Sequence, residues 1–416
     1  MHEFGADRGL LLLKALHDAA ARGVTLRILT AKESIGGDNS TGNSSLPEEV
    51  KGLVDAFPKQ VEVHCWSATG WYGGGILHQK IWIFDKQHVY VGSANMDWKS
   101  LAQVMEVGVM MDHLPSSSLL LEDIQRLFDV WWLWASPELP VDTSTYFSDR
   151  FQSQLMVPSW SQFLPKHKRI PDPFVRARLE AHGNIEEQIK AHFGASPQQT
   201  HAHMFVAAAP LEATAAHSRA FDEDALVYTI RNATSRVSLS VMDFVPYSMY
   251  TLSTHAGSIS WPALTDALLA GIYAKRGLHV RLLISQWQHS NRQMFPALAL
   301  LQQQAALCAQ FRDPCTGKLE IKVFHVPGWD NTTATALKEA KWPAYTRVNH
   351  AKYIVTDTRA NIGTSNMEWG YFYTTAGASV NTDHEPTREA LETLFNRNWD
   401  SSYAQPLNTT SVDASL

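Results

Sequence analysis

Residues 78–85 are HQKIWIFD and residues 350–357 are HAKYIVTD, so His, Lys and Asp recur at the same offsets. Each copy is followed by a turn and a second motif, GSANMDW at residues 92–98 and GTSNMEW at residues 363–369. Two matched motifs in the same order and at nearly the same spacing do not arise by chance. We therefore interpret the chain as two internal repeats, and this decides the expected fold.

The segments around the motifs repeat as well. In each half a helical pattern leads into an apolar strand, a second strand follows, and a further helix closes the half. Strands that alternate with helices are typical of α/β folds, so we expect two pseudo-symmetric lobes, each a mixed β-sheet flanked by helices. The expected helices and strands are 8–21, 24–29, 61–65 and 119–134 in the first half, and 264–275, 278–284, 319–324 and 387–399 in the second.

The two halves differ at their starts. A strand at 237–241, preceded by a helix at 222–230, has no counterpart before residue 8, so the first repeat is expected to lack its first strand. We expect the repeats to cover residues 1–136 and 201–416. Residues 137–200 are expected to connect them, since 137–173 is rich in Pro, Ser and Trp without a clear period.

Composition limits the function classes. With 416 residues, 45% of them apolar, the chain can bury a large core, and its net charge of −6 disfavours a broad basic surface for long nucleic acid. A small cationic pocket remains compatible with that charge. No apolar run approaches the ~20 residues that cross a bilayer, so no transmembrane segment is expected. Of three cysteines, Cys308 and Cys315 are the only sequence-local candidates for a disulfide.

The paired motifs resemble those of the phospholipase D superfamily. Segments 92–101 (GSANMDWKSL), 280–290 (VRLLISQWQHS) and 347–366 (RVNHAKYIVTDTRANIGTSN) look like the branch that contains the animal lysosomal 5′-exonucleases, which degrade single-stranded DNA and RNA. The resemblance implies a pseudo-twofold fold with one active site at the interface of the repeats. It also implies an upstream segment with a membrane anchor, which this sequence does not contain.

The compartment stays open at this point. Five Asn-x-Ser/Thr sequons, at Asn39, Asn43, Asn232, Asn331 and Asn408, permit glycosylation if the protein enters the secretory pathway, although chance explains them equally well. With an upstream leader or anchor, a lysosomal, endomembrane-lumen or secreted location is favoured. Otherwise the protein is expected in the cytoplasm.

Phosphodiester cleavage needs positive charge around the phosphoryl oxygens, a nucleophile in line, and an acid at the leaving oxygen. On an extended strand His78 and Lys80 point to the same face, as do His350 and Lys352, so two facing strands would surround one phosphate. Asn95 and Asn366 are expected to donate to that phosphate, with Ser93 and Thr364 nearby. No metal or cofactor is expected.

The roles of the two histidines require an asymmetry. Glu106 lies 11 residues beyond Asn95, on an expected strand at 104–110, whereas the same offset from Asn366 falls on Gly377. We therefore expect Glu106 to orient His78 as the nucleophile, which leaves His350 as the general acid and base. The alternative is that Glu106 is a solvated strand residue.

The remaining motif residues have weaker signals. Asp85 and Asp357 are expected to tie down the backbone, and Gly92 and Gly363 to open tight turns. Aromatic residues near the motifs are candidates for binding a base, with core packing as the alternative. These are Trp71 and Tyr72 before the first motif, and Trp287 and His289 at a strand end.

Three functions are compatible with the sequence. The first is a metal-independent 5′-exonuclease on single-stranded DNA or RNA, which acts through a phosphohistidine and needs only a narrow pocket. The second is a phospholipase D or transphosphatidylase on phospholipids, which should have an apolar rim near the site. The third is a noncatalytic binding protein with the same fold. A homodimer is an expectation by analogy alone.

Overall fold

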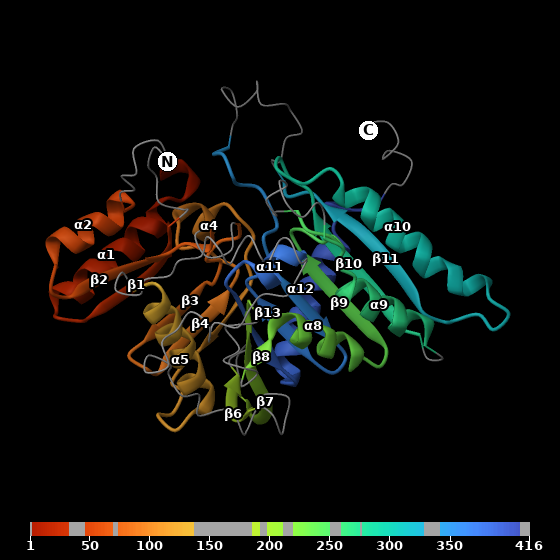
Figure 1. The fold of residues 1–416 in the computed structure, drawn as a ribbon, viewed down its shortest axis with the longest axis horizontal. Coiled ribbons are helices and arrows are strands. Elements are labelled where there is room, and N and C mark those ends of the chain that lie inside the picture. Colours follow the sequence, from red (N-terminus) through yellow and green to blue (C-terminus); the bar gives the residue numbers. More distant parts are fainter. Residues whose placement is uncertain are drawn as a thin grey trace, which may run out of the picture.

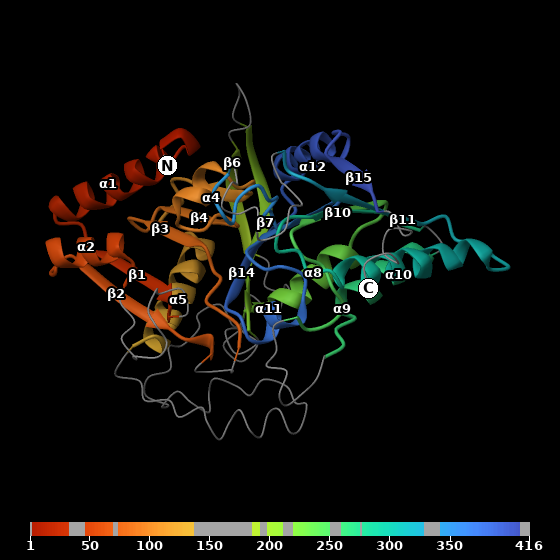
Figure 2. The ribbon, with the colours of Figure 1, turned by 90° about the horizontal axis from the view of Figure 1, so that it is seen from above.

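The computed structural model describes residues 2–32, 46–69, 74–136, 185–191, 198–210, 219–249, 259–274, 277–327 and 342–407. The fold is mixed α/β, with a large mixed sheet and two smaller sheets flanked by helices, as the alternating pattern predicts. Figures 1 and 2 show the first-repeat elements at one end of the molecule and the second-repeat helices α9 and α10 at the other.

The second repeat is built on a ten-stranded sheet. Its order is β15-β11-β10-β9-β12-β13-β14-β7-β6, with β8 paired to β7. Strand β9 is central: it runs parallel to β10 on one side and antiparallel to β12 on the other. The strands are β6 (Ile185–Ala191), β7 (Gln198–Ala209), β8 (Ala220–Phe221), β9 (Arg236–Val241), β10 (His279–Ser285), β11 (Lys318–Phe324), β12 (Tyr353–Thr356), β13 (Ala360–Gly363), β14 (Gly377–Thr382) and β15 (Ala404–Pro406).

The first repeat divides the matching strands between two sheets. Strands β1 (Leu26–Ala31) and β2 (Val61–Trp66) form a parallel pair, while β3 (Ile81–Phe84), β4 (His88–Gly92) and β5 (Gly108–Met111) form an antiparallel sheet. The described part of this repeat has no strand in the place that β9 occupies in the second. This difference accounts for the division, because β9 is the strand that joins β10 to β12.

Helices cover the sheets at the expected places. The longer helices are α1 (Asp7–Ala21), α2 (Glu48–Ala56), α5 (Leu119–Trp134), α8 (Asp222–Arg231), α9 (Ala263–Tyr273), α10 (Met294–Leu307) and α12 (Glu385–Trp399). Single turns are α4 (Trp98–Ala102), α11 (Trp369–Tyr373), η1 (His2–Phe4) and η6 (Cys308–Gln310). No helix in the described residues is both long and apolar enough to span a membrane.

Helix α5 shows how local sequence builds the contact between the repeats. The Ser118 hydroxyl caps the helix by accepting a hydrogen bond from the Leu121 amide, 3.1 Å away. Ile124, Leu127 and Trp131 recur at helical spacing and are fully buried. They belong to one hydrophobic cluster with residues of β4, from the first repeat, and of β7 and β14, from the second (Figure 2). Each buried side chain of this size contributes about 2 kcal/mol to the packing.

Two expectations about the chain can be compared with the fold directly. Cys308 and Cys315 form the expected disulfide, and Cys65 is a free cysteine. The expected connecting segment 137–200 is not all connector, because β6 and the start of β7 lie in it and pair with each other. Asn232 is the one sequon asparagine within the described residues, and it is exposed at the turn between α8 and β9.

Candidate active site

Each motif histidine is anchored to the opposite repeat. The His78 amide donates to the Ala376 carbonyl at 2.9 Å, and the His350 amide donates to the Met105 carbonyl at 2.8 Å. Isolated bridges pair Leu77 with Ala376 and Met105 with Asn349 beside them. The sequence had suggested that both histidines lie within strands. In the structure they lie just before β3 and β12. This exchange of backbone bonds between the repeats fixes the two motifs against each other.

The two imidazoles meet at one point between the repeats. Their ring centroids are 6.2 Å apart and their planes are 77° from parallel. Both motif lysines are buried, and each ammonium donates to the carbonyl of its own histidine: Lys80 to His78 at 2.8 Å, and Lys352 to His350 at 2.6 Å. Residues 272 positions apart therefore assemble two imidazoles and two ammonium groups around a single centre.

Glu106 contacts the other histidine from the one expected. Both of its carboxylate oxygens lie 3.0 Å from Nδ1 of His350, and one accepts a 2.5 Å hydrogen bond from the Ser93 hydroxyl. The expectation that Glu106 orients His78 is wrong, because the residues just before β5 cross to the second repeat and pair beside His350. Nδ1 of His78 is buried and makes no well-formed hydrogen bond among the described residues. The nearby Thr364 backbone slightly favours the protonated form of the His78 ring.

Burial and like charges dominate the protonation of this site. Burial, together with Lys80 and Lys352, lowers the pKa of His78 well below its usual value. Burial and Lys352 lower the pKa of His350 to about 4, but Glu106 opposes this shift. Burial also lowers the pKa of Lys352 to about 8. The site thus crowds cationic groups together, and an anionic phosphate would relieve their repulsion.

Two hydroxyls that were expected to bind substrate are engaged inside the protein. Ser93 and Thr364 are fully buried. Each accepts a backbone hydrogen bond at 3.0 Å, from the amides of Val107 and Ala378 respectively. The structure therefore gives both hydroxyls a positioning role, and Ser93 holds Glu106 in place.

The glycine that opens each second motif is hydrogen-bonded through its backbone to the motif lysine of the same repeat. The Gly92 amide donates to the Lys80 carbonyl at 3.3 Å, and the Gly363 amide to the Lys352 carbonyl at 2.9 Å. A Cβ on Gly92 would lie 2.5 Å from the Gly108 Cα, so a side chain does not fit there.

The two motif asparagines have different surroundings. Asn95 is exposed and lines the pocket in front of His350. Asn366 is fully buried, and its side-chain nitrogen donates to Asp243 at 2.8 Å and to the Tyr371 hydroxyl at 3.2 Å, while its oxygen has no hydrogen-bond partner among the described residues. We had expected Asn366 to donate a hydrogen bond to phosphate. Its side-chain nitrogen instead donates to Asp243 and Tyr371, so it is not free to do so.

Asp243 and Tyr371 were not identified from the sequence. Asp243 follows β9, and burial raises the pKa of its carboxyl to about 6 while Lys352 opposes the shift. The Tyr371 ring lies 5.1 Å from the His78 ring, edge to face. Asp243 could have been found as an acidic residue at the end of an apolar strand, but it lies outside the paired motifs, so no matched offset marked it.

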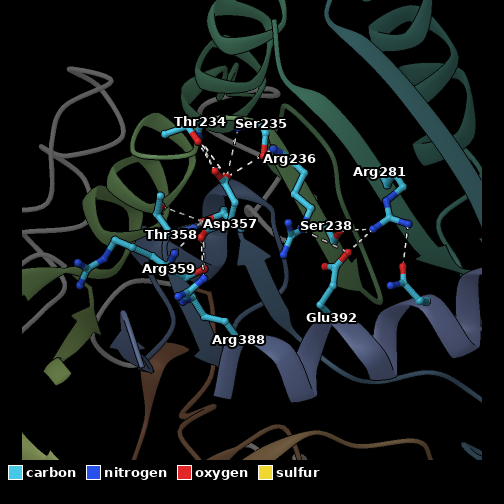
Figure 3. Close-up of polar contacts among 12 residues, drawn as sticks. Thr234, Ser235, Arg236, Ser238, Arg281, Asp357, Thr358, Arg359, Arg388 and Glu392 are labelled. Carbon is cyan, nitrogen blue, oxygen red and sulfur yellow. Dashed lines mark hydrogen bonds and ion pairs between the residues drawn. The ribbon is translucent and has the colours of Figure 1, made fainter. Parts of the chain in front are cut away.

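The two motif aspartates have different contacts. Asp357 accepts hydrogen bonds from the backbone and hydroxyl of Thr234 and from the amides of Ser235 and Arg236, and its carbonyl accepts one from Arg388 of α12 (Figure 3). Although burial opposes it, these bonds lower the pKa of Asp357. Asp85 is exposed in a turn at φ 50°, since the first repeat has no described segment like 234–236 beside it.

A pocket of about 460 Å³ opens in front of His350 and Glu106. Trp287 lines it together with Tyr345, and the rings of Tyr345 and His289 are stacked with centroids 4.6 Å apart. This places the two expected aromatic residues near the site. Trp71 and Tyr72 lie outside the described residues. Within those residues no group of three or more His, Cys, Asp or Glu is arranged to hold a metal ion.

Several known proteins are similar to this chain in sequence. Family profiles described as "Cardiolipin synthase, PLD-like domain" and "PLD3/4, PLD-like domain" match residues 6–132 and 159–329. Phospholipase D Z of Dictyostelium discoideum and the virion nicking-joining enzyme of vaccinia virus are each 32% identical, over 98% of this chain and 79% of their own length. The 5'-3' exonuclease PLD3 of Xenopus tropicalis is 30% identical over 98% of this chain and 70% of its own length.

A solved structure supports the same fold. Phosphatidylserine synthase of Haemophilus influenzae superposes with a TM-score of 0.50 at 9% identity, covering 95% of this chain and 85% of the synthase. The family profiles, the relatives and the two assembled motifs together show that the chain belongs to the phospholipase D superfamily and is a phosphodiesterase.

Proposed function

We propose that this phosphodiesterase removes nucleotides from the 5′ ends of single-stranded DNA or RNA through a covalent phosphohistidine, without a metal ion. The observation that carries the proposal is the pair of imidazoles with centroids 6.2 Å apart, one of them held by Glu106, beside two buried lysines. These groups supply a nucleophile, an acid and positive charge for one phosphate.

The contact between Glu106 and His350 gives a different reason for proposing which histidine is the nucleophile and which is the acid. The Glu106 carboxylate at Nδ1 opposes the lowering of the His350 pKa to about 4, and the negative charge of a bound phosphate would oppose it further, so His350 is the histidine better suited to carry and donate a proton, through Nε2. His78 has no carboxylate partner among its described contacts and lies near both lysines, so it stays neutral and keeps a lone pair. His78 therefore remains the nucleophile and His350 the general acid, as expected, although the carboxylate orients the acid.

The reaction then has two steps. Nε2 of His78 bonds to phosphorus as the bond from phosphorus to the leaving oxygen breaks, and that oxygen takes the proton from Nε2 of His350. In the second step His350 accepts a proton from water as the water oxygen bonds to phosphorus. The bond between phosphorus and His78 breaks, which releases a phosphomonoester and restores both imidazoles.

Relatives support two substrate classes. Two of them carry the names 5'-3' exonuclease and nicking-joining enzyme, and another is named a phospholipase D. The pocket favours nucleic acid, because its wall includes the aromatic residues Trp287 and Tyr345 beside a cationic side chain, Lys99. Hydrolysis or transfer of a phosphatidyl group is the second candidate, carried by the phospholipase D name of that relative.

A substrate panel tests the proposal. Purified protein in EDTA should release mononucleotides from 5′-hydroxyl single-stranded oligonucleotides, and a His350→Ala preparation should not, which controls for contaminating nucleases. Phosphatidylcholine vesicles are the comparison substrate at acidic and neutral pH. Turnover of the lipid alone, or nuclease activity that EDTA removes and a divalent ion restores, would contradict the proposal.

A further inference from the structure

The pocket in front of His350 has a feature that phosphate chemistry alone does not require. Tyr345 lines this pocket with 60% of its surface exposed and a backbone φ of 59°. A bulky residue in the left-handed region is strained, and an exposed aromatic ring gains little from burial. Two unfavourable features at one residue, at the mouth of an active site, indicate a role in binding.

Neighbouring rings hold Tyr345 in place. The His289 ring stacks on it with centroids 4.6 Å apart and planes 16° from parallel, and the Trp287 ring lies edge-on with its centroid 6.4 Å away. Trp287 and His289 also contact each other at 4.8 Å. Three rings in mutual contact form a rigid wall, which is suited to a flat aromatic ligand.

A cation completes the arrangement. The ammonium of Lys99, from α4 in the first repeat, lies 5.5 Å from the Tyr345 ring centroid. A positive group at this ring repels a quaternary ammonium headgroup, which would otherwise bind an aromatic surface well. A ring joined to a phosphate suits both elements, because the ring stacks on Tyr345 while the long Lys99 side chain turns to the phosphate.

The residues that line the pocket indicate which part of the substrate the pocket would hold. His350 and Glu106 are among the described residues that line it, and His78 is not. In an in-line displacement the leaving group departs on the side opposite the nucleophile. The pocket therefore lies on the leaving-group side of phosphorus.

We infer that Tyr345, backed by His289 and Trp287, stacks on the nucleobase of the nucleoside that carries the leaving oxygen. This rests on the proposed nuclease function and extends it by a base-binding subsite that ignores base identity. When a 5′-terminal nucleotide is held on His78 and the remaining strand leaves, that nucleoside is the second from the 5′ end.

The test uses oligonucleotides that are intact, or abasic at the first or the second position. Wild-type kcat/KM should fall about tenfold for the abasic second position. The kcat/KM of Tyr345→Leu should be about tenfold below that of wild type on the intact strand. On the strand abasic at the second position, it should be within twofold of the wild-type value. Tyr345→Phe keeps the ring, so it should keep the roughly tenfold preference for the intact strand over the strand abasic at the second position. Tyr403→Leu removes a tyrosine that is 46% exposed and outside this pocket, so it should also behave as wild type.

A binding measurement tests the stacking without relying on turnover. His78→Ala protein should quench the fluorescence of 2-aminopurine placed at the second position, and the added Tyr345→Leu change should remove the quenching. Equal loss on intact and abasic strands, or dependence on the first base, would overturn the subsite while leaving the nuclease function intact. Wild-type protein that cleaves no oligonucleotide would overturn both.

Discussion

Glu106→Gln is the sharpest perturbation of this site, because it removes one charge and keeps the shape. The Glu106 carboxylate oxygens lie 3.0 Å from Nδ1 of His350. Opposite charges about 4 Å apart interact by about 4 kcal/mol at an effective dielectric constant of about 20. The neutral amide can keep one hydrogen bond, so the net loss is about 3 kcal/mol, the upper value for a charge-assisted bond.

This energy should appear only where a proton must be donated. About 3 kcal/mol corresponds to roughly 10²-fold in kcat, so oligonucleotide cleavage should slow by about that factor with little change in KM. A 4-nitrophenyl phosphodiester has a leaving group that departs without a proton. Its first step, measured as the initial burst of nitrophenolate, should change less than threefold.

The assay compares both substrates for wild type, Glu106→Gln and Glu122→Gln. Glu122 is an exposed residue of α5, so the same chemical change there should have no effect on either substrate. Equal slowing on both substrates would refute the acid role of His350, because it would show that Glu106 matters to the nucleophilic step. Detection of the phosphoryl group on His350 instead of His78 would do the same.

Three further predictions follow from burial and hydrogen bonding. His78→Ala and His350→Ala should each abolish turnover with little change in melting temperature, since both rings are desolvated among like charges; residual activity in either would contradict the paired mechanism. Asp357→Asn should lower the free energy of unfolding by about 2 kcal/mol, while the matched Asp85→Asn changes it by less than about 0.5 kcal/mol, both measured in urea. Burial raises the pKa of Asp222 to about 6, so its contribution to stability is present at low pH and lost as pH rises through 6. Asp222→Asn should therefore gain up to about 3 kcal/mol over wild type between pH 4 and 7, and a pH-independent difference would refute this.

The sequence was sufficient wherever a residue had a copy. The paired His, Lys and Asp offsets predicted the repeats, and the strand and helix patterns around them predicted most elements within a few residues. The role of Asp357 was also predictable, because an acid seven residues beyond His350 on a strand faces away from it. In the structure Asp357 accepts a hydrogen bond from the Thr234 amide, which is the kind of backbone contact that the sequence had suggested.

The sequence was insufficient wherever the repeats differ or exchange contacts. Periodicity along one strand gives the face on which Glu106 lies, but not that the bridge between Met105 and Asn349 carries it to His350. Asp243 and Tyr345 lie outside the two paired motifs, so no matched offset pointed to them. Strand β7 joins the sheet at β14, a long-range pairing that local pattern does not specify.

In the proposed mechanism the two histidines have different roles, although their motifs are copies. Their backbone anchors, their lysines and the hydroxyls behind them are matched between the repeats. One difference between the repeats concerns the histidines directly: Glu106 in the first repeat corresponds to Gly377 in the second, counted from the motif asparagines. Glu106 reaches across the interface to His350, so under the proposed mechanism it makes the imidazole of the opposite repeat the better acid. A single carboxylate on a twofold scaffold would then separate the proton donor from the nucleophile and set the direction in which the leaving group departs.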